Sequence, residues 1–176
     1  MADTNVSNGS AAVQKASWLL LIADLPAKPD YLRVKLRRRV QRLGAVAIKG
    51  AVYLLPNAPD RLADFRSLRR EIAQDGGDAS LCEAHFVDGF TDQELIDRFN
   101  VDRDEEYGGF VASCDLLTAR WAKVEPAARA ALIAQRGRLF SRLEGILGRD
   151  SFGSPQREEA MQALERLAVL DILPPR

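Results

Sequence analysis

The residues best suited to chemistry in this sequence are cations gathered in one short stretch. Between Arg33 and Arg42, six of ten positions are basic, namely Arg33, Lys35, Arg37, Arg38, Arg39 and Arg42. The 176-residue chain carries 25 basic and 25 acidic residues, so its formal net charge is zero and this positive charge is a local feature. Lys and Arg side chains bind phosphate groups, and binding built from such contacts weakens as salt rises. The stretch therefore predicts a surface that contacts the phosphates of DNA.

A helix over residues 31–43 is expected to position these cations. Its apolar side chains fall within about 80° of one another at about 100° per residue, which is typical of one buried stripe; they are Leu32, Leu36, Val40 and Leu43. Gly44 follows at the position of a left-handed C-cap. Lys35, Arg38 and Arg42 then project in one row away from the stripe. Lys49, in a Lys49–Gly50 hairpin signal just after the helix, extends the predicted DNA-binding set.

The same cations also have a structural interpretation. Acidic residues are frequent between Asp88 and Glu106, and those at positions 102–106 could pair with the basic helix. In that case the helix would present a neutralised, solvated face, and the domain would be an interaction module without affinity for DNA. From the residues alone, both interpretations stay open.

Asp24 is a second candidate, because a carboxylate at the end of a central strand can hold a divalent metal. The residues alone favour a turn-forming Asp before Leu25-Pro26, although a symmetric dimer could supply a second copy of the carboxylate. His85 is the single histidine, and no cysteine pair has metal-ligand spacing. The sequence contains no phosphate-binding glycine loop and no Ser or Cys nucleophile motif, so we expect neither a cofactor nor a metabolic enzyme.

The order of elements predicts an α+β fold. Strands are expected over residues 18–23, 45–48, 51–55 and 79–87, with helices over residues 31–43 and 59–75. This order, strand-helix-strand-strand-helix-strand, is that of a ferredoxin-like antiparallel sheet with the first and third strands at its centre. We expect it to span residues 17–88, with residues 1–16 as a flexible tail. Helices from a capping box at Thr91 and Glu94 onward, residues 89–176, are expected to pack on the second face of the sheet.

Composition and cysteine content describe a globular protein. Apolar residues make up 47% of the chain and charged residues 28%. Cys82 and Cys114 are the two cysteines, and without a secretory signal they are expected to be reduced and buried in a cytoplasmic protein. No apolar run approaches the length of roughly 18 residues that a membrane span needs.

Many short segments of the chain resemble the N-terminal domain of the ChrB family of chromate-resistance regulatory proteins. The first group is Trp18-Leu19-Leu20-Leu21-Ile22, Leu25-Pro26-Ala27-Lys28-Pro29, Tyr31-Leu32-Arg33-Val34-Lys35, Leu43-Gly44-Ala45-Val46-Ala47 and Val52-Tyr53-Leu54-Leu55-Pro56. The second is Gly76-Gly77, Cys82-Glu83-Ala84, Phe86-Val87, Arg103-Asp104-Glu105-Glu106-Tyr107 and Asp150-Ser151-Phe152-Gly153. The resemblance thus covers nearly everything after residue 17.

This resemblance implies a DNA-binding protein that controls chromate-resistance genes, or an accessory protein of that system, with basic residues of this domain on the DNA. It also implies that full-length members carry a further C-terminal domain for the response to chromate. We expect that domain to be absent here, and chromate binding by these residues is not expected. A homodimer would present the basic helix twice, as a two-fold operator requires.

A more distant resemblance is to the small nuclease-fold subunit of CRISPR spacer acquisition, whose domain also occurs in phenylacetate-responsive repressors. Its nuclease members carry a metal-binding aspartate at the end of the first strand, which Asp24 could match. The following Leu25-Pro26-Ala27 replaces their polar surroundings. This departure argues against metal-dependent cleavage, so a metal-dependent nuclease is the alternative and a DNA-binding regulator the main expectation.

Overall fold

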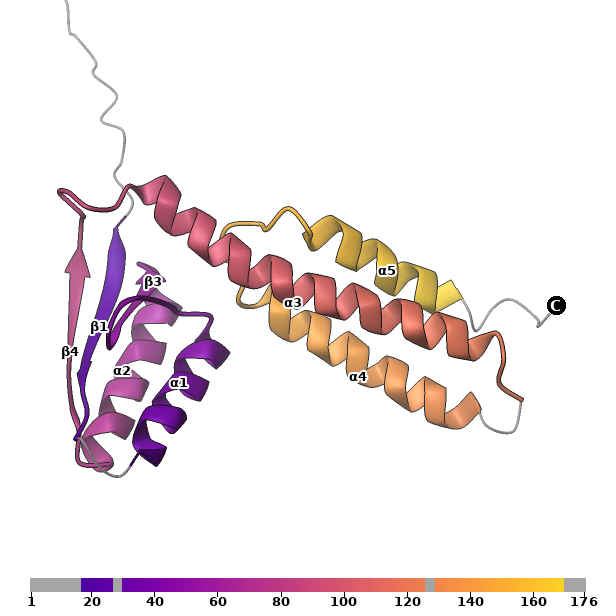
Figure 1. Cartoon of the computed structure of the whole chain (residues 1–176), viewed down its shortest axis with the longest axis horizontal. Coiled ribbons are helices and arrows are strands. Elements are labelled where there is room, and N and C mark those ends of the chain that lie inside the picture. Colours follow the sequence, from indigo (N-terminus) through magenta and orange to yellow (C-terminus); the bar gives the residue numbers. More distant parts are fainter. Residues whose placement is uncertain (1–16, 27–29, 126–128, 170–176) are drawn as a thin grey trace, which may run out of the picture.

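The computed structural model describes residues 17–26, 30–125 and 129–169, so the tail expected over residues 1–16 lies outside it. The strands are β1 (Trp18–Asp24), β2 (Val46–Lys49), β3 (Val52–Pro56) and β4 (Asp78–Ala84). The helices are α1 (Tyr31–Leu43), α2 (Pro59–Gln74), α3 (Asp92–Trp121), α4 (Arg129–Leu147) and α5 (Arg157–Val169). Figure 1 shows a small sheet backed by α1 and α2, and a group of long helices that extends away from it.

The four strands form one antiparallel sheet in the order β2-β3-β1-β4. β1 and β3 are therefore the central strands, as the sequence predicts, and the α+β class is confirmed. Helices α1 and α2 lie side by side on one face of the sheet (Figure 1). Phe65, Leu68 and Ile72 of α2 pack into the same apolar core as Leu19 and Leu21 of β1, all of them almost fully buried.

Among the described residues, the second face of the sheet is covered only at one end, which differs from the expectation that the C-terminal helices would lie over it. The ring of Trp18 stacks on Phe99 of α3 and also meets Phe152, each with centroids 5.9 Å apart. Four residues along the same strand, Ile22 is 45% exposed, and its partner Ser80 on β4 is exposed as well. A uniformly apolar run does not reveal this change in cover along the strand, because each position is apolar whether it is buried or not.

Helices α3, α4 and α5 pack chiefly on one another. Their shared core contains side chains from all three helices: Tyr107, Phe110, Cys114, Leu117, Leu132, Leu139, Leu143, Ile146, Ala160, Ala163 and Leu167. The predicted capping box is confirmed at the start of α3, where the Glu94 N–H donates to Thr91 Oγ1 at 3.2 Å and the Thr91 N–H donates to Glu94 Oε2 at 2.8 Å. Gly108 and Gly109 do not interrupt the 30-residue helix. They bring α3 close to its neighbours, since a Cβ at either position would lie 3.3 Å from a side-chain atom of Gln156 or Arg142.

β4 ends at Ala84, three residues before the end expected from the sequence, so His85 follows the strand. Cys82 is exposed while Cys114 is buried, and both are free thiols. The expectation that both cysteines are buried is wrong for Cys82, because β4 is an edge strand of a sheet whose second face is partly open.

Candidate nucleic-acid interface

The basic helix forms with the bounds that the sequence predicts. Leu32, Leu36 and Val40 are buried, Leu36 and Val40 in the same core as the sheet, and no acidic residue occupies the first turn. Gly44 ends the helix in the left-handed conformation at φ 72°. Its N–H donates to the Gln41 carbonyl and the Ala45 N–H donates to the Val40 carbonyl, each at 3.0 Å, which satisfies carbonyls that the helix itself leaves open. The cations of α1 are thus held on a rigid element.

Two of these cations are bound to α2. Lys35 Nζ lies 2.6 Å from Asp75 Oδ2, and this hydrogen bond raises the pKa of Lys35. Arg39 donates to both oxygens of Glu71, at 2.9 and 2.5 Å. The row of Lys35, Arg38 and Arg42 expected from helical spacing is therefore divided, because α2 runs along the Lys35 side of the helix.

The remaining cations of α1 face solvent. Arg37, Arg38 and Arg42 are exposed and form no ion pair or hydrogen bond with the described residues. Arg33 is also exposed and lies 4.0 Å from Asp30, a weak contact between two solvated groups. Lys49 is exposed at the last position of β2, beside the turn at Gly50. Of the predicted DNA-binding set, Arg33, Arg37, Arg38, Arg42 and Lys49 are thus available to a ligand.

Arg37 is the member of this set that lies toward the sheet. Burial raises the pKa of Tyr53 on β3, and the positive charge of Arg37 opposes that rise. The guanidinium therefore lies close enough to the phenol for the two to interact. The positive charge of Arg37 is therefore felt at the β2–β3 hairpin, which also carries Lys49.

The acidic residues 102–106 do not neutralise the basic helix in the part of the chain that the structure describes. They reach its C-terminal end, where Asp102, Arg103, Glu105 and Glu106 line a pocket of about 340 Å³ with Gln41 and Ala45. Glu106 pairs instead with arginines of the helical region. The partners of Lys35 and Arg39 are the α2 residues Glu71 and Asp75, which the structural interpretation did not anticipate.

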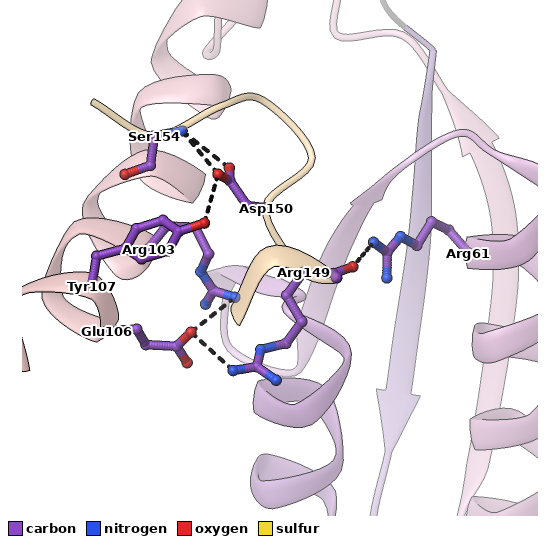
Figure 2. Close-up of polar contacts among 8 residues, drawn as sticks. Arg61, Arg103, Glu106, Tyr107, Arg149, Asp150 and Ser154 are labelled. Carbon is purple, nitrogen blue, oxygen red and sulfur yellow. Dashed lines mark hydrogen bonds and ion pairs between the residues drawn. The ribbon is translucent and has the colours of Figure 1, made fainter. Parts of the chain in front are cut away.

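A polar network of residues from α3 and from the segment after α4 lies beside the C-terminal end of α1, and Figure 2 shows its side chains. Arg149 donates to Glu106 Oε2 at 3.0 Å, and Arg103 Nη1 lies 3.4 Å from the same oxygen. A Cβ on Gly44 would lie 3.0 Å from Arg149 Cβ and 3.2 Å from Arg103 Nη1, so α1 ends directly against this pair. Close packing at Gly44, and not a polar bond from α1, therefore brings the end of α1 against this network.

The same network ties α2 and the loop before α5 together (Figure 2). Arg61 of α2 donates to the Gly148 carbonyl at 2.6 Å, and Tyr107 donates to Asp150 Oδ2 at 3.0 Å. The Ser154 N–H donates to both oxygens of Asp150, while the Ser154 hydroxyl bonds to Asp104. The loop is therefore fixed from both sides.

Besides Arg61, three further arginines of α2 were not identified from the sequence as candidates. Arg66 and Arg70 are exposed, and Arg69 Nε donates to the Ala79 carbonyl of β4 at 2.9 Å. Arg66 and Arg69 line a hollow of about 580 Å³ along β4, together with Asp78 and Glu83. The sequence does show these cations, in the run Arg66-Ser67-Leu68-Arg69-Arg70. The acidic residues of the hollow, Asp78 and Glu83, come from strand β4, so its mixed charge could not be predicted from that run.

Asp24 is exposed at the end of β1, and the antiparallel register sets it opposite Asp78, the first residue of β4. The sequence could not indicate this second carboxylate, since the two are 54 positions apart. One oxygen of Asp78 already accepts the Ala79 N–H at 2.8 Å. Among the described residues, no group of three or more His, Cys, Asp or Glu side chains could hold a metal ion.

Comparison with known families identifies the chain. The model of the family described as Protein ChrB, N-terminal, matches residues 33–170. The chain belongs to this family. The resemblance drawn from short segments after residue 17 is therefore confirmed, and the ChrB N-terminal match includes α1 from Arg33 onward and the long helices.

One curated relative is Protein ChrB of Cupriavidus metallidurans, which is 30% identical over 113 residues. The match covers 64% of this chain and 34% of that protein, so the chain spans about a third of its ChrB relative. No solved structure matches the chain. In the described residues, no helix is long and apolar enough to cross a membrane.

Proposed function

We propose that this ChrB-family chain is a DNA-binding regulator or accessory protein of chromate resistance, and that α1 binds the phosphate backbone. The observation that carries the proposal is the state of Arg37, Arg38 and Arg42, which are exposed and unpaired within the described residues. Lys49 and Arg33 extend this surface. Arginine suits the task because its planar guanidinium can bind a phosphate with two parallel hydrogen bonds.

Lys35 and Arg39 take a different role in this proposal. Both are held by carboxylates of α2, so moving them to a phosphate would leave Asp75 or Glu71 without its partner. They therefore orient α1 on α2, and the unpaired arginines make the contacts. Phosphate contacts of this kind set position more than sequence preference.

Helix α1 belongs to a unit that also contains the sheet and α2. We infer that the sheet with α1 and α2 is the ferredoxin-like arrangement, with residues 17–88 as one unit and residues 89–176 as a helical unit. Support comes from the strand order β2-β3-β1-β4 and from two distinct apolar cores, one around the sheet and one within α3, α4 and α5. A cytoplasmic homodimer would place two copies of α1 on a two-fold operator.

The test is binding of a promoter-length DNA duplex across a salt series from about 50 to 200 mM. The variant Arg38→Ala/Arg42→Ala removes two unpaired cations from α1, and Arg66→Ala/Arg70→Ala is a matched control that removes two exposed arginines from α2. If both α1 residues reach phosphates, the slope of log affinity against log salt should become shallower by about 1.8. The control should keep a slope close to that of the wild type.

Equal losses in the two variants would mean that binding follows the total charge of the domain, and the α1 proposal would then be wrong. Absence of binding by the wild type even at low salt would contradict the DNA-binding proposal and favour an interaction module without affinity for DNA. The nuclease alternative has its own readout, since Asp24 and Asp78 face each other across β1 and β4. Cleavage of DNA with added Mg²⁺ or Mn²⁺, lost in Asp24→Asn, would replace the regulator proposal with that enzyme.

A further inference from the structure

Two uncharged side chains lie in the middle of the solvent face of α1. Val34 is 50% exposed, and Gln41 is exposed as well, although cations surround both residues along the helix. Among the described residues, the Gln41 amide has no hydrogen-bond partner. The buried stripe of Leu32, Leu36 and Val40 lies on the opposite side, so neither residue serves the core. Phosphate binding does not explain them, because a cation at either position would add a phosphate contact.

Cations lie on both sides of this neutral stripe, which we define as Val34 and Gln41. In a helix with about 100° per residue, the two residues are about 20° apart around the axis. Arg37 lies about 40° beyond Gln41, on the side of the β2–β3 hairpin. Arg38 lies about 40° beyond Val34, on the side of α2. Exposed arginines, unpaired among the described residues, therefore border the neutral stripe on both sides.

We propose that α1 enters the major groove of DNA and that Val34 and Gln41 contact base edges there, while the arginines on the two sides bind the phosphates of the two strands. This inference rests on the proposed function and deepens it, because it adds sequence preference to a surface that binds the backbone. A helix with its side chains is about 10–12 Å across, and the major groove of B-DNA is about 12 Å wide. The neutral stripe then faces the floor of the groove, and the cations face its two negatively charged walls.

Each of the two side chains suits one kind of base edge. The amide of Gln41 donates and accepts at once, which matches N7 and the amino group of adenine, and the methyl groups of Val34 match the C5-methyl group of thymine. The residues are seven positions apart. That separation is about 10.5 Å along a helix, or about three base pairs of DNA. We therefore expect an adenine and a thymine about three base pairs apart in the preferred site.

The surroundings of Gln41 also favour a base over a phosphate as its partner. Asp102 and Glu105 of α3 line a pocket together with Gln41, and both are exposed. Because like charges repel, these carboxylates disfavour a phosphate at this end of the neutral stripe. Base edges in the major groove instead include amino groups, which a carboxylate accepts as donors. The end of α1 near α3 is thus suited to the floor of the groove and not to its walls.

The first test measures sequence preference with the full chain. The wild type is used to select a preferred site from a pool of DNA duplexes with a randomised central segment. Gln41→Ala should lose about 5-fold or more of the preference for this site over random DNA, and Val34→Ala about 3-fold or more. Their salt slopes should match that of the wild type, because neither variant removes a cation. The matched controls, Gln74→Ala at the exposed end of α2 and Val101→Ala, 65% exposed on α3, should keep the preference.

Modified bases test each contact separately. Uracil in place of the selected thymine removes the C5-methyl group, so it should weaken binding by the wild type and by Gln41→Ala but not by Val34→Ala. In the same way, 7-deazaadenine removes N7 of the selected adenine, so it should weaken binding by the wild type and by Val34→Ala but not by Gln41→Ala.

The outcomes separate the base contacts from the proposed function. A wild type that binds DNA with a steep salt dependence but selects no preferred site overturns the base contacts and leaves the phosphate-binding surface in place. The same holds if Gln41→Ala and Val34→Ala keep the full preference, or if the two controls lose as much of it. Absence of DNA binding by the wild type overturns both proposals, because the base contacts require a bound duplex.

Discussion

Arg39 on α1 donates hydrogen bonds to both carboxylate oxygens of Glu71 on α2, with Nε–Oε2 and Nη2–Oε1 distances of 2.9 and 2.5 Å. The residues are 32 positions apart, so the pair exists only because the two helices lie side by side. The planar fork of the guanidinium sets both the spacing and the rotation of the helices. Arg39 thereby holds the basic helix against α2, while its neighbour Arg38 is exposed to solvent.

Arg39→Ala should therefore lower the free energy of unfolding by about 1 kcal/mol, since a half-buried, two-bond pair is lost. Arg39→Lys should recover only part of this, because an ammonium group cannot form the fork. Urea unfolding of the two variants and of Arg38→Ala would measure the difference. Arg38→Ala is exposed and should change stability by less than about 0.5 kcal/mol; a loss equal to that of Arg39→Ala would contradict the division of roles.

Gly44→Ala should destabilise the protein more than Gly50→Ala does. Both glycines have positive φ, 72° and 52°, so an alanine at either costs about 1–2 kcal/mol in backbone conformation. Only Gly44 adds a close contact, with its Cβ 3.0 Å from Arg149 Cβ, whereas nothing lies within 4 Å at Gly50. Thermal unfolding of both variants measures the cost of this contact, which is the additional loss of stability in Gly44→Ala over that in Gly50→Ala. Equal losses would show that α1 is not held tightly against Arg149.

The two cysteines should react at very different rates with a thiol reagent at about pH 8. The thiolate is the reactive form, and burial raises the pKa of Cys114 to about 11, so this side chain stays protonated as well as inaccessible. Cys82 is exposed on the edge strand β4. In native protein, one thiol per chain should thus react quickly with the reagent. In Cys82→Ser, almost no thiol should react until denaturant is added. Rapid labelling of folded Cys82→Ser would contradict the burial of Cys114.

Trp18 should be a main source of stability at the junction of the sheet and α3. It is fully buried, stacks on Phe99, and donates from Nε1 to Asp92 Oδ1 at 2.8 Å. Trp18→Ala should cost about 3–5 kcal/mol through the cavity it leaves. Trp18→Phe keeps most of the apolar volume and should cost less, chiefly for the lost hydrogen bond. If chemical denaturation shows that Trp18→Ala loses no more than the half-buried control Trp121→Ala, the junction is not held by this ring.

Local pattern alone was enough to predict much of the fold. The bounds of α1 follow from its apolar spacing and from Gly44, and the capping box of Thr91 and Glu94 begins α3 where expected. The central positions of β1 and β3 follow from the order of strands and helices. These predictions are correct because a helix stripe, a cap or a crossover depends on residues close together in the chain.

Tertiary structure alone decided which cations are free. Helical spacing sets Lys35 beside Arg38 and Arg42, yet Asp75 of α2 binds Lys35 and leaves the other two exposed. The register of β1 and β4 likewise brings Asp78 opposite Asp24, and the partly open sheet exposes Cys82. The sequence by itself determined that one helix concentrates six cations in a neutral chain. Which of them a phosphate can reach depends on carboxylates distant in sequence, because an ion pair forms only where packing brings opposite charges within a few ångströms.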